Sequence, residues 1–275
     1  MDTDEETTQR RGVTEADLVR VLLAARDRRI TTPAPTSQVA GLDLDGAYRV
    51  GAALERRLRE RGYRRAGWKV GFTNKTVWPR FGISEPILGP VYDRTLRTAT
   101  PMAELSLAGF RAPRIEVEVV FGIEAEGGAP DWRRPGWMAL GFEVVDCHYG
   151  WDLTPADSVA DFALHGALIV GPRVHRAAPG FAEGVERLDR LEVRLFRNDE
   201  PVAEGRGSAV LGHPRAALEF VPRLRSNFEA PRRFSGERVV STGTMTALAP
   251  LAAGEHWRVE TRGVDLPGLE LVLED

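Results

Sequence analysis

The sequence predicts an α+β protein in which a helical N-terminal region precedes a strand-rich core. Two observations carry this prediction. Apolar side chains recur at helical spacing before residue 67, whereas short β-branched and aromatic runs separated by Gly and Pro follow it. No repeat and no Pro- or Ser-rich linker divides the chain. We therefore expect a disordered tail over residues 1–12, a helical region over 13–66 and a β-rich core over 67–275.

The helical region should contain two helices with a loop between them. Thr14 can cap the first helix in the manner of a capping box. Residues 30–39, with two prolines and several hydroxyl side chains, read as the loop. The second helix should begin near Asp43 or Asp45 and end at Gly62, because glycine terminates helices readily.

The core is expected to be a set of short strands with two helical interruptions. The helices are predicted over 155–164 and 214–225, where apolar residues recur at helical spacing. The predicted strands cover residues 68–72, 87–92, 114–123, 138–145, 167–170, 191–196, 239–242 and 257–261.

Bulk composition excludes several classes of partner. Hydrophobic residues make up 43% and the formal net charge is −3, so the basic surface that nucleic acids require is missing. No apolar run approaches the ~18 residues of a membrane span, and the N-terminus does not resemble a signal peptide. We expect a cytoplasmic protein without nucleic-acid or membrane partners. The single cysteine, Cys147, excludes a thiolate cage, so any metal would be held by oxygen or imidazole.

Three glutamates in apolar strands are the most informative residues. Glu116 and Glu118 lie on the same face of one predicted strand, about 7 Å apart at ~3.3 Å per residue. Glu143 lies in another run that is apolar on both sides. Such close carboxylates repel and would take up protons unless a cation neutralised them. A solvated sheet face would also produce Glu-x-Glu, but Glu143 favours a site for Mg²⁺, which prefers oxygen ligands.

Other candidate residues have both structural and functional interpretations. Lys69, between glycines, either stabilises negative charge near the metal or is an edge-strand lysine reaching solvent. His148 and His165 are candidate acid–base groups, although a lone histidine in an apolar segment is more often structural. Trp151 is a core or pocket-wall residue. The hydroxyls of residues 241–244 suit a ligand carboxylate or an ordinary turn.

Six ordered motifs resemble those of a known family, the 2-oxopent-4-enoate hydratases and 4-oxalocrotonate decarboxylases of the fumarylacetoacetate hydrolase superfamily. The motifs are Leu-Asp-Leu-Asp-Gly-Ala-Tyr at 42–48, Gly-Trp-Lys-Val-Gly-Phe-Thr at 67–73, Leu-Gly-Pro-Val-Tyr-Asp at 88–93, Pro-Arg-Ile-Glu-Val-Glu at 113–118, Glu-Val-Val-Asp at 143–146 and Val-Ser-Thr-Gly-Thr-Met-Thr at 240–246.

This resemblance implies a fold and a site. The fold is the superfamily's rolled mixed β-sheet barrel, usually in a homo-oligomer. The resemblance places Mg²⁺ (or Mn²⁺) on Glu116, Glu118 and Glu143 and the active-site lysine on Lys69. Asp93, Thr242, Thr244 and Trp151 complete our candidate set as substrate-binding residues, with Lys69, His148 and His165 as the catalytic candidates.

The implied activity is metal-dependent hydration of a 2-hydroxydienoate through an enolate stabilised by the metal. The alternatives are decarboxylation of a vinylogous 2-oxo diacid, a biosynthetic role on an unusual 2-oxo acid, and a silent scaffold subunit of a complex with a sister hydratase or decarboxylase. The chain departs from the family at residues 147–151 and 162–165, where Phe-Ala-Leu-His replaces a typical Asn-Ala-Ser. We expect these changes to alter the substrate while the metal ligands persist.

Overall fold

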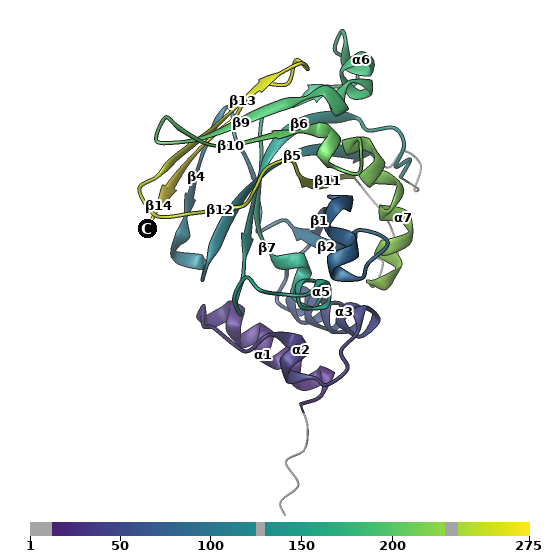
Figure 1. The fold of residues 1–275 in the computed structure, drawn as a ribbon, viewed down its shortest axis with the longest axis vertical. Coiled ribbons are helices and arrows are strands. Elements are labelled where there is room, and N and C mark those ends of the chain that lie inside the picture. Colours follow the sequence, from purple (N-terminus) through teal and green to yellow (C-terminus); the bar gives the residue numbers. More distant parts are fainter. Residues whose placement is uncertain (1–12, 125–129, 229–235) are drawn as a thin grey trace, which may run out of the picture.

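The computed structural model describes residues 13–124, 130–228 and 236–275, and the predicted tail over 1–12 lies outside the described residues. The N-terminal helices lie at one end, and two β-sheets form most of the remainder (Figure 1). This arrangement confirms the α+β expectation.

Three helices precede the first strand: α1 (Glu15–Arg28), α2 (Pro35–Gln38) and α3 (Leu44–Glu60). Thr14 forms the expected capping box, and the Asp43 side chain accepts the Gly46 N–H at the start of α3. The single turn α2 lies within the predicted loop, where a proline at its first position favours helical geometry. Helix α3 packs against α1 on one side and against a later helix, α5 (Pro155–Ala160), on the other.

The larger sheet positions the three glutamates. Its strand order is β2-β1-β11-β5-β6-β7-β3, with β12 beside β5 and β8 beside β6. The bounds are β1 (Arg65–Gly71), β2 (Ile87–Tyr92), β3 (Leu96–Thr98), β5 (Pro113–Glu124), β6 (Trp137–Asp146), β7 (His165–Val170), β8 (Val174–His175), β11 (Glu237–Thr244) and β12 (Ala249–Pro250).

Strand register brings the charged residues to one face of this sheet. Glu116 on β5 lies opposite Glu143 on β6, and Lys69 on β1 lies beside Ser241 on β11. Since directly paired residues point to the same face, four adjacent strands present these side chains together. The same strands are buried on both faces, which explains their nearly continuous apolar sequence.

The second sheet has the order β10-β9-β13-β14-β4. Its strands are β4 (Met102–Ser106), β9 (Glu192–Arg197), β10 (Glu200–Arg206), β13 (His256–Arg262) and β14 (Glu270–Glu274), and the remaining α-helices are α4 (Trp78–Phe81), α6 (Phe181–Glu186) and α7 (Val221–Leu224).

Two predicted helices are broken rather than continuous. The segment 155–164 is helical only to Ala160, and a separate 3-10 turn covers Phe162–Leu164. The segment 214–225 consists of a 3-10 turn over Pro214–Glu219 followed by α7, which has a proline in its first turn. No helix in the described parts of the chain is both long and apolar enough to cross a membrane.

Candidate metal centre

The three glutamates converge in the structure. One carboxylate oxygen from each of Glu116, Glu118 and Glu143 lies within 4.8 Å of the others, and all three residues are buried. Pairing of β5 with β6 explains this geometry, because Glu116 and Glu143 face each other across the ladder and Glu118 is two residues further along. The fold therefore concentrates three acidic groups where water has little access.

Neighbouring donors hold two of these carboxylates in place. The Gly243 N–H donates to Glu118 Oε2 over 2.9 Å, and the Ser241 hydroxyl donates to the same oxygen. Glu143 Oε1 lies 3.0 Å from Lys69 Nζ and 3.1 Å from His165 Nδ1. Among the described residues, Glu143 Oε2 makes no hydrogen bond although it is buried.

One lysine does not neutralise this cluster. Burial raises the pKa of Glu116 and of Glu118 to about 8, although the nearby Lys69 ammonium opposes this rise. Burial lowers the pKa of Lys69, but attraction to Glu143, Glu116 and Glu118 outweighs that effect and the pKa is raised. A protonated Lys69 therefore balances one carboxylate, and the other two hold protons near neutral pH in the absence of another cation.

A hard divalent cation fits this donor set. Three carboxylates from adjacent strands supply the oxygen ligands that Mg²⁺ and Mn²⁺ prefer, and a bound ion would satisfy the orphaned Glu143 Oε2. Because the chain's single cysteine, Cys147, lies outside the cluster and donates to the Gly150 carbonyl, no thiolate competes for the ion there. The donor chemistry thus agrees with a magnesium or manganese centre.

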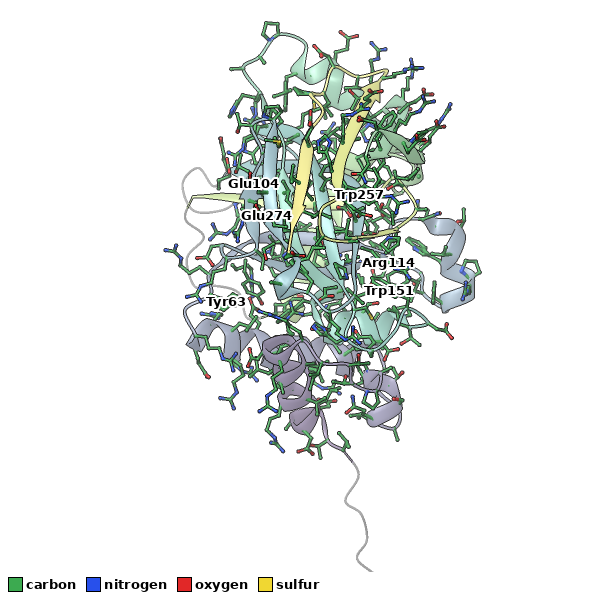
Figure 2. The ribbon with its side chains drawn as sticks, turned by 90° about the vertical axis from the view of Figure 1, so that its left-hand side faces the viewer. Tyr63, Glu104, Arg114, Trp151, Trp257 and Glu274 are labelled. Atoms are coloured by element: carbon green, nitrogen blue, oxygen red, sulfur yellow. The ribbon has the colours of Figure 1, made fainter. Side chains whose placement is uncertain are left out.

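A cavity of about 360 Å³ opens onto this cluster. Lys69, Glu116 and Glu118 line one end of it, together with Thr244. Trp151 contributes to the wall, and Arg114 lies against its ring with the guanidinium carbon 4.1 Å from the ring centroid (Figure 2). The cavity therefore brings together the lysine, two glutamates, one hydroxyl and one aromatic residue from the predicted set.

Other candidate residues lie elsewhere. Asp93 accepts hydrogen bonds from the main chain and side chain of Arg64, and Thr242 donates to the Val119 carbonyl; neither lines this cavity. His148 faces a different cavity and bonds Asp161 through Nδ1 over 2.8 Å.

His165 contacts Glu143 of the glutamate cluster. It is fully buried between Glu143 Oε1 and the Thr95 hydroxyl, which lies 2.8 Å from its Nε2. Burial and the positive charges of Lys69 and Arg26 lower the pKa of His165 well below 6.5, so the ring is neutral near pH 7. Its geometry suits orientation of Glu143.

The cavity also contains polar residues that were not singled out from the sequence. Thr73, Asn74, Ser158 and Thr246 line it. Thr73 belongs to the Gly-Trp-Lys-Val-Gly-Phe-Thr motif, so its proximity to Lys69 in the sequence was a usable signal. Asn74 directly follows this motif and Thr246 ends the motif at 240–246, whereas Ser158 reaches the cavity through contacts between distant segments.

Comparison with known proteins finds enzymes similar to this chain. No family model matches the chain. It is 27% identical over 252 residues to 2-hydroxyhexa-2,4-dienoate hydratase from Comamonas testosteroni, which covers 89% of this chain and 92% of that protein. It is 26% identical over 239 residues to 4-oxalocrotonate decarboxylase from Pseudomonas sp. strain CF600, covering 84% and 87% respectively.

The chain is a relative of these hydratases and decarboxylases. Its fold matches that of 4-oxalocrotonate decarboxylase from Pseudomonas putida G7, solved with magnesium and adipate, at a TM-score of 0.80, 24% identity and coverage of 94% and 97%. Fumarylpyruvate hydrolase from Pseudomonas aeruginosa, solved with Mn²⁺ and pyruvate, aligns at a TM-score of 0.55 and 15% identity over 77% of this chain and 89% of that one. The expected fumarylacetoacetate-hydrolase-like fold is confirmed.

The backbone after α5 adopts an unusual conformation. Phe162, Ala163 and Leu164 have φ values of 59°, 53° and 63°, a left-handed conformation that costs a non-glycine residue about 1–3 kcal/mol. This run turns Ala163 and Leu164 into the cavity and leads directly to His165 at the start of β7. The strained backbone therefore lies in the segment that shapes the cavity and leads to the residue contacting Glu143.

Proposed function

We propose that this protein is a metal-dependent hydratase that adds water to a 2-hydroxydienoate, the enol form of a 2-oxo-alkenoate. The observation that carries the proposal is the convergence of Glu116, Glu118 and Glu143 beside Lys69 at one end of a cavity. The hydratases and decarboxylases similar to this chain support the same reaction class, a lyase acting on a small 2-oxo acid.

Each residue of the centre has a defined role in this proposal. Glu116, Glu118 and Glu143 would hold Mg²⁺ or Mn²⁺, which when bound supplies a Lewis acid that withdraws electrons from the 2-oxo acid head. Lys69, kept protonated by the surrounding carboxylates, donates a hydrogen bond to the developing oxyanion and exchanges a proton with it. His165 orients Glu143 rather than touching the substrate.

The net reaction adds one water molecule. The 2-hydroxyl loses its proton and becomes a ketone while C5 gains a proton; the oxygen of water then bonds to C4 and a proton is added at C3. The product is a 4-hydroxy-2-oxo acid. Thr73, Ser158 and Thr244 supply hydroxyl groups on the cavity wall that can orient the attacking water.

Decarboxylation of a vinylogous 2-oxo diacid is the second candidate. It would share the metal and the enolate, but its distal carboxylate would leave as CO₂ instead of water adding to the alkene. Similarity to the decarboxylase from strain CF600 favours keeping it. A biosynthetic role on an unusual 2-oxo acid uses the same centre. A silent scaffold subunit would have no reason to retain a buried, unneutralised acidic cluster.

The test is an activity assay with a matched glutamate control. Purified protein with Mg²⁺ should consume a conjugated 2-hydroxydienoate, which is measured as the loss of the ultraviolet absorbance of this substrate. The protein should release no CO₂ from the corresponding diacid. Glu116→Gln should abolish turnover and weaken Mg²⁺ binding, whereas Glu200→Gln on an exposed strand position should change neither. Full turnover and full Mg²⁺ affinity in Glu116→Gln would show that the assignment is wrong.

Assembly is part of the same proposal. We expect a homo-oligomer in the cytoplasm, with association to a sister hydratase or decarboxylase as a further possibility to be tested by co-purification. The division into a tail, a helical region and a catalytic core over 67–275 also stays a prediction, as do catalytic roles for His148 and substrate-binding roles for Asp93 and Thr242.

A further inference from the structure

We infer that the substrate carries a bulky, uncharged hydrocarbon group at the end distal to its 2-oxo acid head, with an aromatic ring as the best fit. This inference deepens the proposed function and rests on it. It goes beyond the reaction class because it specifies the chemistry of the part of the substrate that does not react.

The cavity lining combines a charged cluster with a larger set of apolar side chains. Glu116, Glu118 and Lys69 define the end where an acidic head with its metal ion belongs. Most of the other lining side chains are apolar; they come from residues 70–87, 145–153, 163–164 and 248 and comprise Val70, Phe72, Val77, Phe81, Ile87, Val145, Trp151, Leu153, Ala163, Leu164 and Leu248. A substrate bound by its head would direct its distal end along these side chains.

Aromatic residues in this wall are held in fixed positions. The rings of Phe72 and Phe81 meet edge to face with centroids 5.1 Å apart. Phe72 has a φ of 56°, and its carbonyl accepts a hydrogen bond of 2.6 Å from the Trp78 indole. Trp151 forms another part of the wall. Such preorganised ring faces and edges suit an aromatic or branched hydrocarbon, because the wall has already lost its conformational freedom.

The apolar wall offers little to a distal carboxylate. Among the described residues that line the cavity, Lys69 is the only cation, and its ammonium is paired with Glu143. Arg114 lies over the ring of Trp151 (Figure 2) and is not itself one of the lining residues. Burying a carboxylate against hydrocarbon without a partner is strongly unfavourable, whereas burying a hydrocarbon group there is favourable.

The size of the cavity agrees with a large distal group. Its volume of about 360 Å³ lies within the ~300–1,000 Å³ typical of sites that bind drug-sized ligands. The left-handed run over Phe162–Leu164 supports this interpretation. This strained backbone places a small residue, Ala163, and an apolar residue, Leu164, in the cavity wall.

A binding series separates the distal group from the shared head. Calorimetric titration with Mg²⁺ present compares pyruvate, 2-oxoglutarate and phenylpyruvate, which have the same head with no tail, a carboxylate tail and an aromatic tail. We expect phenylpyruvate to bind at least about tenfold more tightly than pyruvate, which corresponds to ~1.4 kcal/mol, and 2-oxoglutarate to bind no more tightly than pyruvate. Tightest binding of 2-oxoglutarate, or equal binding of all three, would overturn the inference.

The same titrations distinguish a failure of the proposed function from a failure of the inference about the distal group. If none of the three acids binds in the presence of Mg²⁺, the proposed function fails and the inference fails with it. If all bind but the order differs from the expected one, the proposed function stands and only the inference about the distal group fails.

A charge introduced into the wall provides the second test. Leu153 is a partly exposed lining residue, so Leu153→Arg should be tolerated and should shift the preference toward 2-oxoglutarate by at least about tenfold relative to phenylpyruvate. Val202→Arg, at an exposed position of β10 outside the cavity, is the matched control and should leave the order unchanged. An unchanged order in a folded Leu153→Arg protein would contradict contact between this wall and the distal group.

Discussion

Binding of Mg²⁺ should depend steeply on pH, because the ion must displace protons from the glutamate cluster. The pKa of Glu116 and the pKa of Glu118 are each raised to about 8, so both carboxyls hold protons at pH 6 in the metal-free protein. The perturbation is a change of pH between 5.5 and 9 at constant ionic strength. An ordinary exposed carboxylate site, with a pKa of ~4.3, would already be ionised throughout this range.

The expected magnitude follows from proton linkage. Each proton displaced changes the apparent dissociation constant by a factor of about ten per pH unit below the pKa. The two carboxyls interact and titrate as a pair, so between pH 6 and 7 we expect the affinity to rise by about 10- to 100-fold and to level off above pH 8.

Stability of the metal-free protein should change in the opposite sense. The folded-state pKa of each carboxyl lies above its unfolded value of about 4.5. The contribution of these carboxyls to the free energy of unfolding is therefore fully present below pH 4.5 and is lost as pH rises toward 8.

Calorimetry measures the pH dependence of Mg²⁺ binding directly. Mg²⁺ titrations at each pH, repeated in two buffers with different ionisation enthalpies, give both the affinity and the number of protons released. One to two protons should be released per ion at pH 6.5, and almost none at pH 9. An affinity that stays constant from pH 6 to 8, without proton release, would refute the argument that burial keeps these carboxyls protonated.

Two substitutions test how the centre is supported. His165→Ala should weaken Mg²⁺ affinity by about 10- to 100-fold, because Glu143 loses a donor that fixes its carboxylate; His165→Asn should recover part of the loss, and calorimetry with the intact chain measures both. Gly243→Ala places a Cβ 2.0 Å from Thr73 Oγ1 at a φ of 104°, so its midpoint of thermal unfolding should fall more than that of Gly254→Ala, where φ is 79° and no atom lies within 4 Å. Equal shifts for the two glycines would contradict a steric role for the close approach.

The glutamate centre was predictable because it depends on local periodicity and strand pairing. Glu116 and Glu118 share a face in any β-strand, and Glu143 needs a neighbouring strand in the observed register to join them. The same alternation did not predict how the hydroxyl side chains of β11 are arranged. A bulge between Ser241 and Thr244 shifts the register there; Ser241 donates to the Glu118 side chain, whereas Thr242 donates to the main-chain carbonyl of Val119 on the same strand, β5.

Positions set by loops and by distant contacts were less accessible to sequence reasoning. His148 follows β6 closely enough to suggest a shared pocket, yet the loop after the strand turns its ring toward Asp161. Asp93 was placed by resemblance, and its pairing with Arg64 depends on the pairing of β1 with β2, which has no local sequence signature. The left-handed run over Phe162–Leu164 interrupts a segment with helical spacing, because three successive positive φ angles in non-glycine residues are imposed by packing rather than by propensity.

The most direct test of the central claim is an anomalous-difference map from a crystal grown with Mn²⁺ and oxalate. The account predicts one strong peak bonded to carboxylate oxygens of Glu116, Glu118 and Glu143, with oxalate on the same ion and its far side facing the cavity. A cluster without a peak, or an ion held by other residues, would contradict the assignment of this centre.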